Sequence, residues 1–313
     1  MSYTVHTVGV HGGDGFLIVD GNNSVLVDCG FAWAAPKLLD DVRGILGTEG
    51  APDWLVLTHS HYDHCSAMAY LREHMPTMQV AASKYAGHVF KRPGAWETMR
   101  KLNAVSAQEH GLSEFIDVPN RFVLDRVLGP EDMIDAGNLH FTVLPAAGHT
   151  KCSIALWEPE QKLLACCESA GVYSGEFATR ILPDGTSVPE DVPYLVGPAC
   201  LVGHDLSLDF IARARSLGAQ AMISPHYGLI EGASRVNEFF TAADFFHLYA
   251  VRRICELYKN GLSEEEICSK FLEFFYTQVV ADFQPRAAFE LNATIMVHRV
   301  LVDCGYVEPS STL

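Results

Sequence analysis

Residues 56–71, VLTHSHYDHCSAMAYL, constrain the fold of this chain more than any other stretch. Four side chains that can bind metal fall within six positions there: His59, His61, Asp63 and His64. The apolar run before them predicts a strand that ends at Thr58, and the residues after them have the pattern of an amphipathic helix. Open α/β folds gather their chemistry in the loops at the carboxyl ends of strands. Because imidazole and carboxylate groups suit zinc, iron or manganese, the stretch predicts a metal site at a strand-to-helix junction.

Strand and helix patterns alternate on both sides of this junction. Apolar runs predict strands at residues 3–10, 15–21, 24–30, 53–58 and 78–83, with helices at about 35–47 and 64–74. Residues 83 to about 116 read mainly as helix, and strands follow at 121–129, 139–146, 152–158 and 162–168. A Gly- and Pro-rich segment then reads as a long loop at about 171–205, before a helix near 207–217 and a strand at 219–225. The alternation predicts an α/β layer architecture.

The last quarter of the chain changes character. From about residue 232 onward no strand pattern is evident, and three helices are expected. The second of them has Ser263 as its expected N-cap and three glutamates, 264–266, in its first turn. We therefore divide the chain into a domain over residues 1–231 and a helical C-terminal extension over residues 232–313.

Composition narrows the classes of function. With 49% hydrophobic residues the chain can bury a sizeable core, and its net charge of −16 gives no broad basic footprint for nucleic acid or an anionic membrane. No apolar run approaches the roughly 18 residues that a transmembrane helix needs, and the N-terminus lacks a signal-peptide pattern. The nine cysteines include no C-x-x-C pair, which favours reduced thiols over a disulfide framework. We expect a cytoplasmic protein that acts on a small molecule, and the sequence leaves homo-oligomer formation open.

The motif THSHYDH resembles the first metal-binding motif of the metallo-β-lactamase superfamily of metallo-hydrolases. The resemblance covers roughly residues 3–230, with the later motifs in the order that the family requires. Those motifs are LPAAGHTKCSIALW with His149, LLACCESAG with Glu168, and MISPHYG with His226. The resemblance implies an αββα four-layer sandwich with a C-terminal helical appendage.

The resemblance also assigns the ligands. It implies one metal ion held by His59, His61 and His149, and a second held by Asp63, His64 and His226. Glu168 stands where the family has an aspartate and would bridge the two ions. Because glutamate is one methylene longer, it can bridge only if the strand end sits further back or the metal pair shifts. The neighbouring Cys167 should point to the opposite face of the strand, and Asp28 in VLVDCG would orient the ligand loop instead of binding metal.

These ligands lead to an expected reaction. Two divalent ions, with zinc favoured slightly over iron or manganese, would supply hydroxide at neutral pH and polarise a substrate oxygen. Asp63 would bind metal and carry a proton to the leaving group, as the catalytic residue. We expect hydrolysis of an ester, thioester or lactone, because no Lys/Arg cluster that would bind a phosphodiester lies near the ligand motifs.

The helices after the last ligand histidine are most similar in layout to the branch that includes the pseudomonad quinolone-signal thioesterase. That resemblance implies that residues 232–313 cap the active-site edge, with the apolar side chains of FFTAADFFHLYAV and FFYTQVV suited to a hydrophobic tunnel. His247 and His298 fall on helical stripes of this extension, where packed or surface positions are the commoner role.

Two other classes of function remain open. The departure at Glu168 and the large helical extension are compatible with a partner-binding protein whose metal site is vestigial. The ligand set is equally compatible with an iron-dependent redox enzyme acting on sulfur or oxygen.

Overall fold

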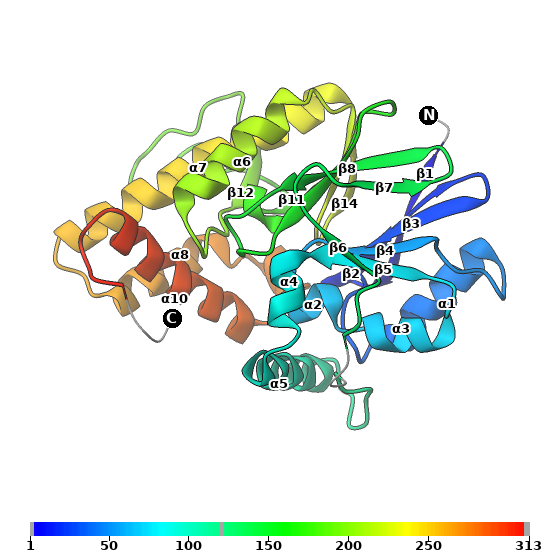
Figure 1. Ribbon diagram of the computed structural model, residues 1–313. Coiled ribbons are helices and arrows are strands. Elements are labelled where there is room, and N and C mark those ends of the chain that lie inside the picture. Colours follow the sequence, from blue (N-terminus) through cyan, green and yellow to red (C-terminus); the bar gives the residue numbers. More distant parts are fainter. Residues whose placement is uncertain (1–2, 119–121, 310–313) are drawn as a thin grey trace. The chain divides into compact units, whose positions relative to one another are not determined.

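The computed structural model describes residues 3–118 and 122–309 (Figure 1). The chain forms two compact units, and each is discontinuous in sequence. Unit 1 consists of Met1–Pro145 and Cys152–Cys166, and unit 2 consists of Ala146–Lys151 and Cys167–Leu313. The domain boundary predicted between residues 231 and 232 falls inside unit 2, and it stays a prediction.

The first sheet of unit 1 has six strands in sequence order (Figure 1). They are β1 (Thr4–Val10), β2 (Gly13–Asp20), β3 (Asn23–Val27), β4 (Trp54–Leu57), β5 (Gln79–Ser83) and β6 (Arg126–Leu128). The first three strands pair antiparallel, whereas β3 to β6 pair parallel. The carboxyl ends of β3 and β4 therefore meet at one edge of the sheet, where the predicted metal ligands follow β4. The strand predicted at 121–129 is shorter, and residue 121 lies outside the described residues.

Helices of unit 1 pack on one face of this sheet. They are α1 (Ala35–Leu46), α2 (Tyr62–Cys65), α3 (Met68–His74), α4 (Lys84–Val89) and α5 (Pro93–Glu109). Leu17 of β2, Leu26 of β3 and Leu55 of β4 all point toward this face. They pack with α1 side chains such as Leu38 in one buried cluster. Each such leucine contributes about 2 kcal/mol through burial, so this layer holds the parallel strands in register.

The remaining strands of unit 1 form an antiparallel set: β7 (Met133–Ala136), β8 (Leu139–Pro145), β9 (Ile154–Glu158) and β10 (Leu163–Ala165). In β8, which the sequence predicted as a strand, Leu139, Phe141 and Val143 are buried while the residues between them are partly exposed. The sequence prediction missed β7, because its four residues MIDA contain only one fully buried large side chain, Ile134.

Unit 2 contains two strand pairs where the sequence predicted less regular structure. Strands β11 (Val172–Phe177) and β12 (Tyr194–Gly197) pair antiparallel within the segment 171–205, so the prediction of one long loop there was wrong in part. Gly175 and Glu176 interrupt the apolar pattern of β11 and hid it. The predicted strand near 219–225 is β13 (Ala221–Ser224), and it pairs with β14 (Gly228–Glu231), which the sequence prediction also missed.

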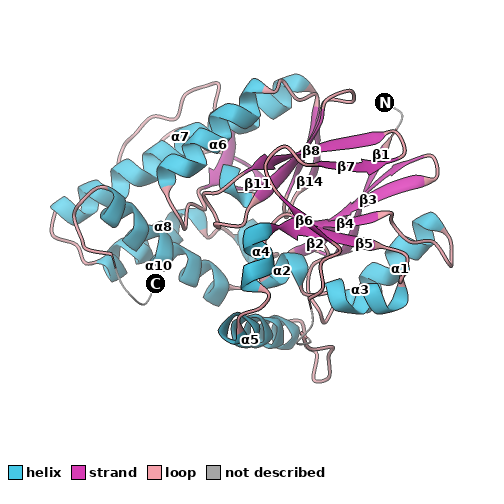
Figure 2. Ribbon diagram, in the orientation of Figure 1, coloured by secondary structure: helices cyan, strands magenta, loops and turns pink. Residues whose placement is uncertain are grey.

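Helices are the main regular structure of unit 2 (Figure 2). A short 3-10 turn spans Glu168–Ala170, and the helices are α6 (His204–Ser216), α7 (Ala233–Lys259), α8 (Glu264–Phe275), α9 (Gln278–Ala281) and α10 (Arg286–Asp303). The Ser263 side chain accepts from the Glu266 backbone N–H and the Glu266 carboxylate accepts from the Ser263 N–H, so the predicted cap of α8 is present as a capping box. The sequence predicted three helices after residue 232, whereas the structure has four in the described part of this segment, because Thr277 caps an additional short helix, α9.

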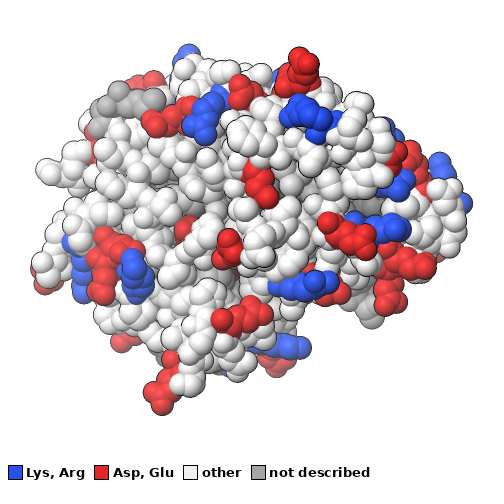
Figure 3. Space-filling view, turned by 180° about the vertical axis from the view of Figure 1, so that it is seen from behind, with Lys and Arg blue, Asp and Glu red and all other residues white. Residues whose placement is uncertain are grey.

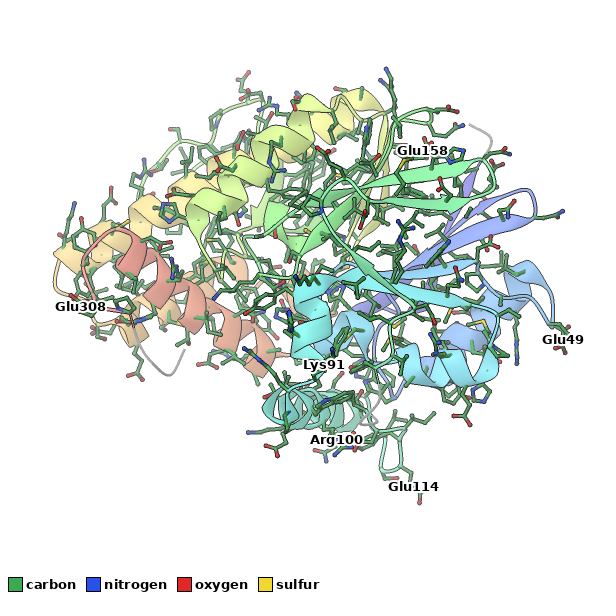
Figure 4. All side chains as sticks on the ribbon, viewed as in Figure 1. Glu49, Lys91, Arg100, Glu114, Glu158 and Glu308 are labelled. Atoms are coloured by element: carbon green, nitrogen blue, oxygen red, sulfur yellow. The ribbon has the colours of Figure 1, made fainter. Side chains whose placement is uncertain are left out.

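Charged side chains are dispersed over the surface. On the face shown in Figure 3, and among the residues that the structure describes, Lys and Arg lie scattered between Asp and Glu and form no continuous basic area. Glu49, Glu114 and Glu308 are exposed and project outward in Figure 4. Within the described ranges, no helix combines the length and the apolar character that a bilayer crossing requires.

Gly30 provides a test of how tightly the edge after β3 is packed. A methyl group at Gly30 would stand 1.9 Å from the carbonyl oxygen of Gly13, and Gly30 has a φ of 67°. Gly21 has a similar φ of 61° but open space around it. We expect Gly21→Ala to cost about 1 kcal/mol for its backbone conformation alone and Gly30→Ala to cost at least about 2 kcal/mol more. Denaturant unfolding of both variants measures this, and equal losses would contradict the close approach.

His247 on α7 provides a pH test. Burial lowers its pKa from 6.5 to about 4, because the fully buried ring is expensive to charge. The native state therefore binds fewer protons than the unfolded state, so stability from this group is intact above pH 6.5 and falls as the pH drops toward 4. Between pH 7.5 and 4.5 the parent should lose about 2 kcal/mol more than His247→Leu. Unfolding free energies at both pH values check this, and identical losses would contradict it.

Candidate metal centre

The Asp28 carboxylate organises the edge of unit 1 where β3 and β4 end. Its Oδ1 accepts from the Thr58 backbone N–H at 2.7 Å, and its Oδ2 accepts from the Thr58 hydroxyl at 2.7 Å. The same Oδ2 lies 2.9 Å from Nδ1 of His64. Because β3 and β4 are parallel neighbours, the residue after β3 is placed beside the residue after β4. Asp28 thus contacts both ends of the predicted metal-binding loop.

This network fixes the tautomers of two histidines. An ionised carboxylate only accepts hydrogen bonds, so Nδ1 of His64 carries the proton that Asp28 accepts. The Thr58 hydroxyl gives its own hydrogen to Asp28 and lies 3.1 Å from Nδ1 of His59, so it accepts from that nitrogen. In both rings the lone pair is consequently on Nε2, and both side chains are buried. Such outer hydrogen bonds orient histidines for metal binding.

Backbone hydrogen bonds tie the same two segments together. The Cys29 N–H donates to the His64 carbonyl at 2.8 Å, and the Gly30 carbonyl accepts from Ser66 at 3.0 Å and Ala67 at 3.2 Å. These bonds draw the backbone at Ser66 and Ala67 toward Gly30, which explains why the single helix predicted at 64–74 is divided into α2 and α3. Asp28 itself has a φ of 59°, a conformation that costs of order 1–2 kcal/mol in a non-glycine residue. The surrounding bonds hold it there.

The other two predicted ligands of unit 1 lie beside this network. The ring centroids of His59 and His61 are 4.7 Å apart, and those of His59 and His64 are 4.2 Å apart. His61 is the N-cap residue of α2, and the Asp63 Oδ2 lies 3.8 Å from Nε2 of His64. The Asp63 side chain is 14% exposed. Unit 1 therefore brings together the four ligands predicted from the first motif.

In unit 2, His149 is held at its backbone and at its ring. Its N–H donates to the Ser169 hydroxyl at 3.0 Å, and its Nδ1 lies 2.9 Å from the Ala199 carbonyl oxygen. A carbonyl only accepts, so Nδ1 carries the proton and Nε2 presents its lone pair. The preceding Gly148 packs so closely that a methyl group there would lie 2.4 Å from the Ser207 hydroxyl. The loop position of His149 is therefore sterically fixed.

Glu168 contacts two histidines through different oxygens. Its Oε2 lies 2.9 Å from Nε2 of His149, and its Oε1 lies 3.3 Å from Nε2 of His226. The carboxylate is buried, as are both rings. This is the arrangement of a bridging carboxylate that has one histidine on each side.

The donor chemistry of this trio fits metal ions. A carboxylate oxygen and the imidazole lone pair of His149 both carry negative potential, so at 2.9 Å they need a positive charge, either a proton or a metal ion. Two ligands bound at about 2.0–2.2 Å to the same ion are roughly 3 Å apart when they subtend about a right angle. The separations from Glu168 to both histidines are of this size, so the residues present suit divalent metal.

His226 occupies the tight turn between β13 and β14. It has a φ of 62°, which is uncommon for a residue with a β-carbon and is often found at functional sites. The ring of Phe283 stacks on the His226 ring with centroids 5.4 Å apart and an angle of 11°. The turn and the stacking partner together set the direction of the imidazole.

The remaining residues singled out from the sequence lie in other surroundings. Cys167 has its Sγ 3.9 Å from the Ala146 carbonyl oxygen, while Glu168 faces the histidines, in keeping with opposite orientations. His247 bonds through Nδ1 to the Ala243 carbonyl at 2.8 Å, and His298 lies 3.0 Å from the Glu264 carboxylate. Both are accounted for within the helical packing of unit 2.

Sequence reasoning missed several supporting groups. They are the Thr58 hydroxyl, the Ser169 hydroxyl, the Ala199 carbonyl and the Phe283 ring. Thr58 is adjacent to the metal motif and could have been found from that position. No sequence pattern marks a backbone carbonyl such as that of Ala199, whose role depends on folding alone.

Comparison with known proteins agrees with this geometry. Residues 8–204 match a model of the metallo-beta-lactamase superfamily, and the match contains every predicted ligand except His226. A metallo-beta-lactamase family protein from Thermus thermophilus has a similar structure, with a TM-score of 0.62, 16% identity, and coverage of 97% of this chain and 94% of that one. Because so little of this chain is left out, the similarity extends into the C-terminal helices.

Two further structures share the fold over a smaller part of the chain. An archaeal metallo-beta-lactamase superfamily protein from Sulfolobus tokodaii matches with a TM-score of 0.51 and 15% identity, covering 76% of this chain and 84% of that one. A B3 metallo-beta-lactamase described as the first with an active-site glutamic acid matches with a TM-score of 0.51 and 16% identity, covering 78% and 86%. At these identities the similarity concerns the fold.

Asp28→Asn tests the hydrogen-bond network. Its amide N–H₂ group would face donors on Thr58 and His64, so the histidine orientation should be lost and metal affinity should fall about 10- to 100-fold. Competition with a chromophoric chelator measures the affinity. Asp53→Asn is the matched control, because Asp53 also accepts a backbone N–H, from Ser24 at 2.9 Å, but lies before β4 instead of after it. Equal affinities of the two variants would contradict the role of Asp28.

Proposed function

The chain belongs to the metallo-β-lactamase superfamily, and we propose on that basis that it is a metal-dependent hydrolase of an ester, thioester or lactone. Family membership confirms the fold class expected from the sequence, the mixed α/β sandwich of this superfamily with C-terminal helices added. It also supports a hydrolase-type enzyme. The observation that carries the proposal is the Glu168 carboxylate, which contacts His149 with one oxygen and His226 with the other.

The proposed centre uses the ligands that the sequence predicted. One divalent ion would be held by His59, His61 and His149, the other by Asp63, His64 and His226, with Glu168 between them. The match to the superfamily over residues 8–204, which includes all of these ligands except His226, supports this assignment, and so does the arrangement of each group of ligands within its own unit. Nitrogen and oxygen ligands accept zinc, iron and manganese, and we propose zinc slightly ahead of the others.

Protein side chains would perform distinct parts of the reaction. When bound, divalent ions lower the pKa of coordinated water toward about 7 and polarise a substrate carbonyl. Asp63 is the partly exposed carboxylate among the proposed ligands, with 14% of its side chain accessible, so it is the group proposed to accept the proton of the attacking water and pass it to the leaving group. Asp28 would keep the Nε2 atoms of His59 and His64 directed at the ions throughout.

The wall around Glu168 supports an uncharged substrate group. Within unit 2, Glu168 borders a small cavity of about 30 Å³ whose other lining residues include Leu201, Phe271, Phe289 and Met296. Its polar lining side chains besides Glu168 are the amides of Gln284 and Asn292, and no Lys or Arg takes part. Lys and Arg are common partners of a bound phosphodiester, whereas an acyl group needs no cationic side chain. We therefore place esters, thioesters and lactones ahead of phosphodiesters.

The phenylalanines expected to line a tunnel have two different environments. Phe239, Phe240 and Phe246 of α7 are fully buried, so they are packing residues of unit 2. Phe274 and Phe275 of α8 border a cavity of about 370 Å³ between α7 and α8, and Phe271, which lies outside the two predicted stretches, borders both that cavity and the one at Glu168. The α8 and α10 residues at the Glu168 cavity thus support a role for the extension in selecting a small-molecule substrate. We propose neither a nucleic acid nor a membrane as a partner.

Metal analysis combined with a substrate panel tests the proposal. The parent, loaded separately with zinc, iron or manganese, should hold two ions and hydrolyse at least one ester, thioester or lactone. Glu168→Gln keeps the shape but removes the charge, so it should lose the second ion and at least about 100-fold in turnover. Glu158→Gln is the matched control, because Glu158 is an equally buried glutamate at the end of β9 that accepts a backbone N–H of a turn.

The alternatives predict different results from the same measurements. A parent without metal and without turnover would support a partner-binding protein. Oxygen-dependent consumption of a persulfide by the iron form would support a redox enzyme. Full metal content and full turnover in Glu168→Gln would show that this carboxylate is not a ligand.

A further inference from the structure

Two of the nine cysteines form a pair that the proposed hydrolysis does not use. Cys255 lies on α7 and Cys304 follows the last residue of α10, and their Sγ atoms are 3.2 Å apart. Cys304 is exposed and Cys255 is partly exposed, whereas the other seven cysteines are buried. We propose that this pair is an oxidation site, at which a hydroperoxide converts the two thiols to an intramolecular disulfide that ties α10 to α7. The proposal does not depend on the proposed function.

The geometry allows the bond with a small movement. A disulfide requires sulfur atoms about 2.05 Å apart, so the two atoms must approach by only about 1 Å. Cys304 is the C-cap residue of α10, and Gly305 after it has a φ of 74°, so the movement falls at a helix end instead of in a helix interior. Helix ends open at lower cost than the core.

The surroundings favour Cys304 as the first thiol to react. Burial, followed by the hydrogen bond that the Cys255 thiol donates to Cys304, raises the pKa of the Cys255 thiol to about 12, while the nearby Lys259 ammonium acts in the opposite direction. Cys255 therefore stays protonated, and it is the less exposed of the two thiols. Cys304 is the more accessible sulfur, and reactivity toward oxidants follows access and thiolate character.

The chemistry balances as two successive displacements. The Cys304 thiolate attacks one peroxide oxygen, the O–O bond breaks, and the leaving oxygen takes a proton to become water or an alcohol. The resulting sulfenic acid is attacked by the Cys255 sulfur, which loses its proton as the S–O bond breaks and a second water leaves. Two electrons pass from the sulfurs to the peroxide.

The bond would constrain the helix that borders Glu168. Cys255 and Cys304 are 49 positions apart, and the chain between them contains α8, α9 and α10. Phe289, Asn292 and Met296 of α10 line the small cavity at Glu168, nearer the start of the same helix. Oxidation would therefore join the far end of that helix covalently to α7, and α10 would no longer separate from α7 without reduction.

Mild oxidation followed by intact mass measurement tests the proposal. One equivalent of hydrogen peroxide should remove two hydrogens from the parent, and peptide mapping should find Cys255 linked to Cys304. The oxidised parent should melt a few degrees above the reduced parent, because the link restricts the unfolded chain, and a reductant should reverse the shift. Neither Cys255→Ser nor Cys304→Ser should form the link.

Cys268→Ser is the matched control, because Cys268 lies on the neighbouring α8 but is buried, with its Sγ 3.5 Å from the Thr294 hydroxyl. It should form the link as the parent does. A disulfide-linked dimer, a sulfinic acid on Cys304 without a link, or a link that persists in Cys255→Ser would each overturn the proposal.

Discussion

The contact on which the rest of the site depends is the Asp28 carboxylate at the end of β3. It accepts from the Thr58 N–H, the Thr58 hydroxyl and His64, and through Thr58 it also sets the tautomer of His59. Burying this carboxylate costs little free energy only when all three of its hydrogen-bond donors are in place. The parallel pairing of β3 with β4, the positive φ of Asp28 and the close approach at Gly30 all serve to keep them in place.

Much of the fold could be predicted from the sequence because its strongest patterns are local. The apolar strands β1 to β5 and the amphipathic helix α1 have long, regular patterns, and the capping box of α8 involves residues only three apart. The predictions that failed concern elements that depend on contacts between residues far apart in the sequence. The break between α2 and α3 arises from the Gly30 carbonyl, more than thirty positions upstream. Strands β11 and β14 are short and interrupted or flanked by glycine, so pairing defines them more than composition does.

The candidate site likewise contains some residues that the sequence identified and others that only the folded structure shows. His59, His61, Asp63 and His64 stand in one dense motif, and a resemblance to a family supplied His149, Glu168 and His226. Glu168 was expected at a strand end, but it begins a 3-10 turn after β10, which changes where its carboxylate is directed. The Ala199 carbonyl and the Phe283 ring could not be predicted, because a hydrogen bond over 50 positions and a ring contact over 57 leave no local signature.

The discontinuity of the two units has a consequence for the order in which the protein matures on the ribosome. Ala146–Lys151 belongs to unit 2, although the residues on both sides belong to unit 1. His149 therefore emerges before Ser169 and Ala199, the groups that fix its backbone and its ring. Strands β8 and β9 can pair while the connection between them still lacks these contacts. The segment that carries His149 therefore acquires its final hydrogen bonds only after the chain has been made as far as Ala199, some fifty residues later.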